Sequence, residues 1–140
     1  MSGRKTPTVL LVEDNPADAG LVQEALEEHR VDCDLILATD GERAIRFIES
    51  LNAHSDSCPD LIILDLNLPR RTGREVLEFI RVNDKCADVP IIILTSSNAQ
   101  IDRDDAMKFG ATRYIKKPSR LADFLKLGSL FKEILNLPLS

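Results

Sequence analysis

Acidic residues follow two of the apolar segments of this chain, and a hydroxyl and an amino group follow two others. Glu13 and Asp14 come directly after the first apolar segment, and Asp65 follows four consecutive apolar residues further along. Thr95 and Lys117 close two later segments. An acidic nucleophile with a lysine, a hydroxyl and carboxylates for a metal ion is suited to phosphoryl transfer, which depends on positioning and charge neutralisation.

Three carboxylates brought close together require a compensating cation. Two carboxylates roughly 4 Å apart repel one another by about 4 kcal/mol at an effective dielectric constant near 20. Mg²⁺ binds through one or two carboxylates, keeps several waters and accepts phosphate oxygens. Lys117 supplies a second positive charge. In such a site Asp65 is the candidate nucleophile, which would attack phosphorus and carry an acyl phosphate.

Each residue also has an ordinary structural interpretation. The acid pair could be a helix-start feature, and Asp65 could cap backbone amides in a loop. Thr95 is a common strand-end residue, Lys117 beside Lys116 is by default a solvated basic pair, and Tyr114 could serve packing alone. The functional interpretation depends on the joint arrangement, because four of the five expected strands end in complementary groups.

The elements that must position these residues alternate regularly along the chain. Segments with the apolar pattern of strands alternate with segments of helical periodicity. The expected strands lie at 8–14, 33–39, 61–65, 90–97 and 112–118, and the expected helices begin near Asn15, Asp40 and Gly73 and then span 100–109 and 119–136. This alternation predicts an α/β domain with a parallel sheet covered on both faces. The carboxyl ends of the strands then collect the polar residues in one cleft.

Length, charge and hydropathy exclude several classes. A chain of 140 residues predicts one domain, 1–140, with a short polar N-terminal tail at about 1–7 and a C-terminal tail at about 136–140. The net charge of −5 disfavours a nucleic-acid surface. No apolar run approaches the roughly 18 residues of a membrane span, and no signal for export precedes the first strand. We therefore expect a cytoplasmic protein.

The cysteines predict no disulfide or zinc framework. Cys33, Cys58 and Cys86 are odd in number and widely spaced, and they form no CxxC pair. Buried or inert thiols in a reducing cytosol fit this pattern better.

The sequence resembles the response-regulator receiver domains of two-component signalling over essentially its whole length. The matching motifs are "VLLVEDN", "LIILDLNLP", Pro69, Gly73, "IIILTSS" and "YIKKP". Asp65 and Thr95 are 30 positions apart, and Thr95 and Lys117 are 22 apart, which selects Lys117 over Lys116. The resemblance implies a flavodoxin-like fold with five strands in the order 2-1-3-4-5. Within the family, the chain looks most like single-domain regulators that partner phytochrome-type histidine kinases.

The resemblance also implies roles for the acidic residues. Asp65 would accept a phosphoryl group from a kinase phosphohistidine. Asp14, Asp65 and the backbone carbonyl of Asn67 would bind Mg²⁺ or Mn²⁺, with Glu13 acting through water.

Further roles concern the conformational switch. Lys117 would pair with Asp65 and later with a phosphoryl oxygen, and the Lys117–Pro118 peptide would be cis. Thr95 would turn toward the phosphoryl group, and Tyr114 would rotate inward behind it.

The resemblance further implies that the signal leaves by protein contact, or that the protein drains phosphate from a histidine kinase. The output face would combine the fourth helix, the fifth strand and the last helix. Leu135, Leu137 and Leu139 could contribute to a homodimer or partner contact there, or they could fold back on the domain.

Three other classes remain as alternatives. A haloacid-dehalogenase-type phosphatase needs a second aspartate two residues after the first, where this chain has Asn67, which cannot donate a carboxyl proton. A flavodoxin needs a phosphate loop where this chain has the acidic "EDNPAD". An inactive receiver acting as an adaptor is disfavoured by the intact acids, threonine and lysine. The chain is therefore expected to be a phosphoacceptor that catalyses only its own phosphoryl transfer and slow autodephosphorylation, not an enzyme.

Overall fold

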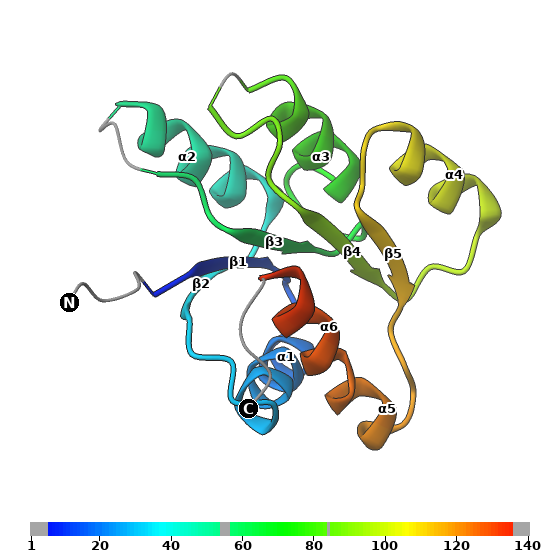
Figure 1. The fold of residues 1–140 in the computed structure, drawn as a ribbon. Helices are drawn as coiled ribbons and strands as arrows, with labels where there is room; N and C mark the ends of the chain where they lie inside the picture. The colour runs from blue at the N-terminus through cyan, green and yellow to red at the C-terminus, as the bar shows by residue number, and fades with distance from the viewer. Residues whose placement is uncertain (1–5, 54–56, 84, 136–140) are drawn as a thin grey trace.

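Five parallel strands form one sheet in the order β2-β1-β3-β4-β5 (Figure 1). The computed structural model describes residues 6–53, 57–83 and 85–135. The strands are β1 (Thr8–Val12), β2 (Asp34–Ala38), β3 (Leu61–Leu64), β4 (Ile91–Thr95) and β5 (Arg113–Lys116). The predicted fold class and strand order are therefore confirmed.

Helices cover both faces of the sheet (Figure 1). One face carries α2 (Gly41–Ala53), α3 (Gly73–Arg81) and α4 (Gln100–Lys108), and the other carries α1 (Pro16–Glu28), α5 (Leu121–Leu125) and α6 (Leu127–Ile134). This two-sided cover explains why β3 and β4 are aliphatic without interruption, since every residue of both strands is buried.

Alternating side chains of the central strands supply two separate cores. Leu10, Ile62 and Ile93 point to the core beneath α2 and α3, whereas Leu11 and Ile63 point to the core beneath α1. The period of two along each strand divides these residues between the faces. Both cores hold the strands in register, and that register sets where the strand ends lie.

Local sequence signals define the ends of several helices. The side chain of Asn15 accepts hydrogen bonds from the backbone N–H groups of Ala17 and Asp18, and Pro16 occupies the first position of α1. Gly110 follows α4 with φ of 92°, a conformation that favours glycine, and it ends that helix as expected.

The last helix differs from the single helix predicted for 119–136. It is divided at Lys126 into α5 and α6. Both the backbone N–H and the hydroxyl of Ser129 donate to the carbonyl oxygen of Lys126, at 3.1 and 2.9 Å. This three-residue spacing interrupts the four-residue pattern of an α-helix, which accounts for the division.

The tail leucines are described only in part. Leu135 is half-buried and packs against the core beneath α1, which agrees with folding back for this residue. Leu137 and Leu139 lie outside the described residues.

The expectation of unbridged thiols is wrong for two of the three cysteines. Cys58 and Cys86 form a disulfide with their Cα atoms 5.7 Å apart, and Cys33 is free. Cys58 precedes β3 and Cys86 precedes β4, and these strands are neighbours in the sheet. The pairing therefore follows from strand order, which the spacing of 28 residues does not reveal.

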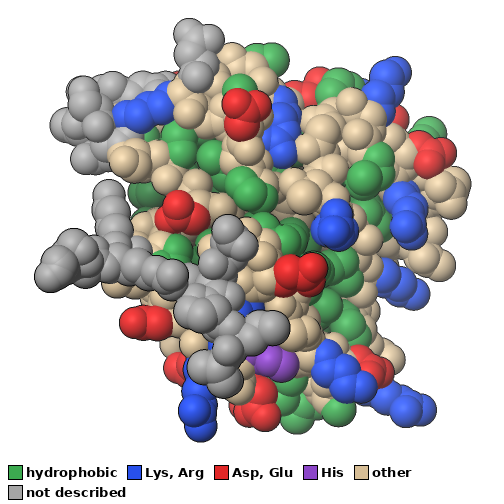
Figure 2. All heavy atoms as spheres, in the orientation of Figure 1, with side chains coloured by type: hydrophobic (Ala, Val, Ile, Leu, Met, Phe, Trp, Pro, Cys, Tyr) green, Lys and Arg blue, Asp and Glu red, His purple; other side chains and the backbone are tan. Residues whose placement is uncertain are grey.

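The surface charge and the helix lengths can be described for one face and for the described ranges. Figure 2 shows basic and acidic side chains interspersed on the face it presents, without a continuous basic surface. Within the described ranges, no helix is long and apolar enough to cross a membrane.

Candidate functional site

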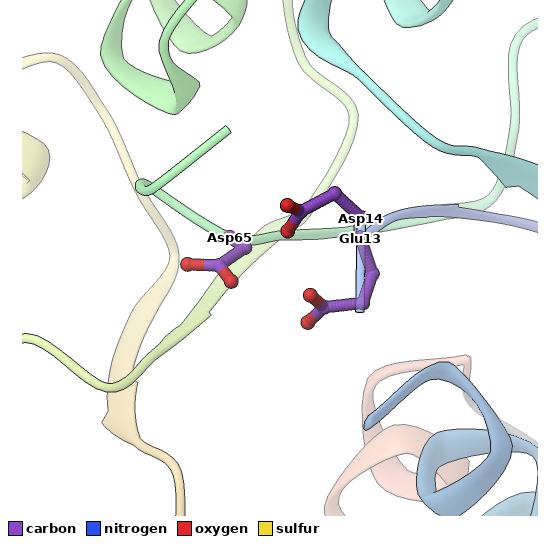
Figure 3. Close-up of side chains that lie close together, drawn as sticks. All are labelled: Glu13, Asp14 and Asp65. Carbon is purple, nitrogen blue, oxygen red and sulfur yellow. The ribbon is translucent and has the colours of Figure 1, made fainter. Parts of the chain in front are cut away.

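The carboxyl ends of β1 and β3 bring three carboxylates together (Figure 3). One carboxylate oxygen from each of Glu13, Asp14 and Asp65 lies within 4.8 Å of the other two. Glu13 and Asp65 are buried, and Asp14 is exposed. Figure 3 shows that all three side chains project into the space beyond the ends of the two strands. The predicted convergence of the acids is thus confirmed.

The sheet itself fixes the backbones of these acids. The N–H of Glu13 donates to the carbonyl of Ala38 at 3.0 Å, and the N–H of Asp65 donates to the carbonyl of Val12 at 3.1 Å. Each acid is therefore the first residue past its strand while still hydrogen-bonded to the neighbouring one. Burial of Glu13 and Asp65 follows from their position in the middle of the sheet edge.

Lys117 reaches the same cluster from the chain after β5. Its Nζ lies 2.9 Å from Oδ2 of Asp65, 2.8 Å from Oε1 of Glu13 and 2.7 Å from Oδ2 of Asp18. Its backbone N–H donates to the carbonyl of Thr95 at 2.7 Å, which continues the β4–β5 pairing by one residue. An ammonium group has three N–H donors, and here all three have a carboxylate partner.

Asp18 is the residue that sequence reasoning missed. It lies in the first turn of α1 and completes the carboxylates around the lysine amino group. The only signal was an acid four positions after Asp14, and an acid in a first helical turn is ordinarily explained by the helix dipole.

The cis prediction for Lys117–Pro118 is wrong. Within the described residues no peptide bond is cis. The trans form of an X–Pro bond is favoured by about 0.5–1 kcal/mol in the absence of other constraints. The amino group of Lys117 reaches the carboxylates with this bond in trans.

The pKa values of the buried groups reflect this pairing. Burial raises the pKa of Glu13 above 4.5, although hydrogen bonds from Lys117 and from the N–H of Asn15 act in the opposite direction. Burial would lower the pKa of Lys117, but hydrogen bonds to Asp18, Glu13 and Asp65 outweigh it and raise that pKa. The lysine is therefore fully charged at neutral pH.

The loop after Asp65 is held against its own carboxylate. The N–H of Asn67 donates to Oδ1 of Asp65 at 3.1 Å, and the N–H of Gly73 donates to the carbonyl of Leu66 at 3.0 Å. A Cβ at position 73 would collide with the carbonyl oxygen of Asp65 and lie 2.5 Å from Cα of Leu66. Glycine is thus required at the start of α3 by the close approach of this loop.

Thr95 and Tyr114 both contact the segment after β4. The buried Thr95 accepts a hydrogen bond at Oγ1 from the N–H of Ser97, at 3.4 Å. The hydroxyl of Tyr114 donates to the carbonyl of Ser97 at 3.1 Å. In the described part of the chain no hydrogen bond joins either residue to Asp65.

The donor set fits a hard divalent cation. Three carboxylates lie within 4.8 Å, and they are oxygen ligands of the kind that Mg²⁺ and Mn²⁺ take. With Asp18 the site holds four acidic side chains, three of which contact the single lysine, so negative groups are in excess. A divalent ion would offset most of that excess.

Comparison with known proteins gives one family. Residues 9–127 match the response regulator receiver domain. The response regulator Rcp1 of Synechocystis sp. (strain ATCC 27184 / PCC 6803 / Kazusa) is 38% identical over 130 residues, covering 91% of this chain and 88% of Rcp1.

Two solved structures share the fold over nearly the whole chain. The phosphorylated cyanobacterial phytochrome response regulator RcpA has a TM-score of 0.85 at 32% identity, with 94% of this chain and 95% of RcpA covered. The Mn²⁺-bound form of Rcp1 has a TM-score of 0.83 at 34% identity, with 96% of this chain and 99% of that chain covered. The chain belongs to the response regulator receiver family.

Proposed function

We propose that this protein is a phosphorylation-dependent signalling switch whose phosphoacceptor is Asp65. The observation that carries the proposal is a buried aspartate with Lys117 2.9 Å away and two further carboxylates beside it. Such a carboxylate is held in place by hydrogen bonds and lies next to a positive charge. These are the properties that a nucleophile toward phosphorus needs.

The reaction follows from the charges in the site. A carboxylate oxygen of Asp65 forms a bond to phosphorus while the P–N bond of a kinase phosphohistidine breaks and its electron pair stays on the imidazole nitrogen. Lys117 offsets the charge on the phosphoryl oxygens through its N–H groups. Asp14, Asp65 and the Asn67 carbonyl would hold Mg²⁺ or Mn²⁺, and Glu13 would contribute through water. The ion, when bound, supplies further neutralisation of the phosphoryl group.

Thr95 and Tyr114 are proposed to transmit the change. Both contact Ser97, through its N–H and its carbonyl respectively. A hydroxyl of Thr95 that turns to a phosphoryl oxygen gives up its contact with Ser97 and frees this segment to move with Tyr114. Phosphorylation would then favour one of two arrangements of the segment after β4.

The proposed partner is a phytochrome-type histidine kinase, met in the cytoplasm. The support is the likeness to Rcp1 and to RcpA, which is described as a cyanobacterial phytochrome response regulator. A phosphatase acting on other substrates is disfavoured because Asn67 stands where the second aspartate of such enzymes is needed. The protein would thus catalyse its own phosphoryl transfer and its slow reversal only.

A homodimer through α4, β5, the last helix (α5 and α6) and the C-terminal tail is the second part of the proposal. Ile101 and Met107 on α4 and Leu121 on α5 are 69%, 47% and 55% exposed. Contact with a second copy would remove these apolar side chains from water, at a gain of about 25 cal/mol per Å².

The test uses acetyl phosphate with Mg²⁺, followed by intact mass and by light scattering on a sizing column. We expect the wild type to gain one phosphoryl group, and Asp65→Asn to gain none. Asp32→Asn, an exposed aspartate on the opposite edge of the sheet, is the matched control and should behave as wild type.

Two outcomes would count against the proposal. A folded wild type that takes no phosphoryl group from acetyl phosphate or from candidate kinases would favour an adaptor that binds partners without phosphorylation. A protein that stays monomeric with and without the phosphoryl group would refute the proposed dimer. The proposed phosphoacceptor role of Asp65 would be unaffected by that result.

A further inference from the structure

Asp18, on α1, contacts the amino group of Lys117. The helix contributes none of the acids Glu13, Asp14 and Asp65. Oδ2 of Asp18 lies 2.7 Å from Nζ of Lys117, and the Asp18 side chain is 25% exposed. The lysine side chain is 10% exposed, so the pair lies at the mouth of the site. Nothing in the transfer reaction described above uses this carboxylate.

We propose that Asp18 is a positioning residue for phosphoryl transfer, which holds Lys117 so that one N–H stays directed at Asp65. The inference rests on the proposed phosphoacceptor role of Asp65. Glu13 and Asp18 together occupy two of the three N–H donors of the lysine. The third N–H contacts the unmodified Asp65. Once Asp65 is phosphorylated, the same N–H would donate its hydrogen bond to a phosphoryl oxygen.

Two anchors from different elements restrict a flexible side chain. Lysine has a flexible four-carbon stem with many rotamers, so a single partner leaves its amino group several positions. Glu13 is at the end of β1, whereas Asp18 is on α1, and the two approach the same nitrogen. The amino group therefore has a defined place before any phosphodonor arrives.

Asp18 is itself fixed by the start of α1. Its backbone N–H donates to Oδ1 of Asn15 at 3.2 Å, as part of the cap of this helix. The same helix packs against α5 and α6, which follow Lys117 in the chain. The anchor is thus part of the rigid fold and does not depend on an exposed loop.

The competing explanation is that Asp18 only adds negative charge at the mouth. A carboxylate near the entrance would repel an anionic phosphodonor, and its removal would then accelerate phosphorylation. Positioning predicts the opposite sign, because a lysine with one anchor fewer is less often in the productive place.

The experiment measures the rate of phosphorylation by acetyl phosphate at saturating Mg²⁺. We expect Asp18→Ala to be about 5- to 20-fold slower, as loss of orientation predicts. Asp18→Asn should lose less, because its amide oxygen still accepts from the lysine. Glu24→Ala removes one exposed carboxylate from the same helix and should keep the wild-type rate.

A double-mutant cycle with Lys117→Ala separates positioning from a merely structural effect. We expect Asp18→Ala to cause no further slowing in the Lys117→Ala background, because no amino group is left to hold. Faster phosphorylation of Asp18→Ala and Asp18→Asn, or equal slowing in both backgrounds, would overturn the inference. A wild type that is not phosphorylated would instead refute the proposed function, so the two failures are distinguishable.

Discussion

Lys117 is the residue on which the charge balance of the site depends. Its Nζ is within 2.9 Å of three carboxylates, and Glu13 and Asp65 are both buried. A buried carboxylate that loses its cationic partner keeps the full cost of leaving water. The lysine therefore stabilises the fold in addition to its place in the proposed chemistry.

At neutral pH and without divalent ions, we expect Lys117→Ala to lower the free energy of unfolding by about 3–5 kcal/mol. Acidification should restore part of this loss. The folded pKa of Glu13 is already raised by burial, so its contribution to stability is present below 4.5 and is lost as pH rises through the folded value. Without the lysine the folded pKa of Glu13 rises further, because the hydrogen bond from Lys117 lowers it. The pH range over which the contribution of Glu13 is lost then extends to higher pH.

Urea denaturation at neutral and mildly acidic pH, with and without Mg²⁺, measures this effect. Mg²⁺ should recover stability, because it replaces the missing positive charge. Lys126→Ala, at an exposed lysine, is the control and should stay within about 0.5 kcal/mol of wild type. Equal stability of Lys117→Ala and wild type at neutral pH would contradict the argument.

At the scale of elements, the start of α3 holds the loop that carries Asn67. Thr72 and Glu75 form a capping box, in which the Thr72 hydroxyl accepts from the N–H of Glu75 at 3.2 Å and the Glu75 carboxylate accepts from the N–H of Thr72 at 3.1 Å. Gly73, next in the chain, lies against the backbone of Asp65. The cap therefore fixes both the helix and the chain beside the proposed phosphoacceptor.

We expect Thr72→Ala to lower the free energy of unfolding by about 1 kcal/mol, a usual value for loss of an N-cap side chain. The hydrogen bond from the Thr72 N–H lowers the pKa of Glu75 below 4.5. The contribution of Glu75 is thus present above 4.5 and is lost as pH falls through the lowered folded value.

Thermal unfolding near neutral pH and at acid pH checks this prediction. The difference between wild type and Thr72→Ala should be present at both pH values, because alanine keeps the backbone N–H that donates to Glu75 and loses only the hydroxyl that accepts from the Glu75 N–H. Ser57→Ala, at an exposed loop hydroxyl, should have no effect. A Thr72→Ala protein as stable as wild type would show that the box contributes nothing.

At the scale of the whole molecule, a covalent link joins two chain segments at the edge opposite the site. Cys58 and Cys86 are 28 positions apart, and the segment between them includes β3, the loop after Asp65 and α3. A link across that separation restricts the unfolded chain by about 3–4 kcal/mol in the chain-entropy description. Cys86 is fully buried, so access of reductants depends on the half-buried Cys58.

Reduction should lower the denaturation midpoint of the wild type, because it breaks the Cys58–Cys86 disulfide. The midpoint of Cys58→Ser should be the same with and without reductant, because this variant has no disulfide to break. Cys33→Ser is the matched control, because Cys33 is free, and it should respond to reductant as the wild type does. Titration of free thiols in the unfolded, unreduced protein should find one, that of Cys33. Three reactive thiols, or a midpoint insensitive to reductant, would show that the link is absent under the conditions used.

Elements and site residues differ in how far the sequence revealed them. The apolar segments predicted all five strands to within two residues at every end. The central strands β3 and β4 were the clearest, because a strand buried on both faces leaves an uninterrupted aliphatic run. The division of the last helix at Lys126 was not visible, since the competing Ser129 contacts are a matter of local geometry. The roles assigned to Thr95 and Tyr114 stay predictions.

The sequence by itself determined the alternation of elements, the acids, lysine and threonine at strand ends, and membership of the receiver family, because these depend on residue types and spacing along the chain. Only the tertiary structure decided that Asp18 joins the lysine, that Cys58 meets Cys86 and that Lys117–Pro118 is trans. These features depend on which distant segments lie side by side and on where side chains point. Strand order and packing set those relations, and the spacing of residues along one chain does not contain them.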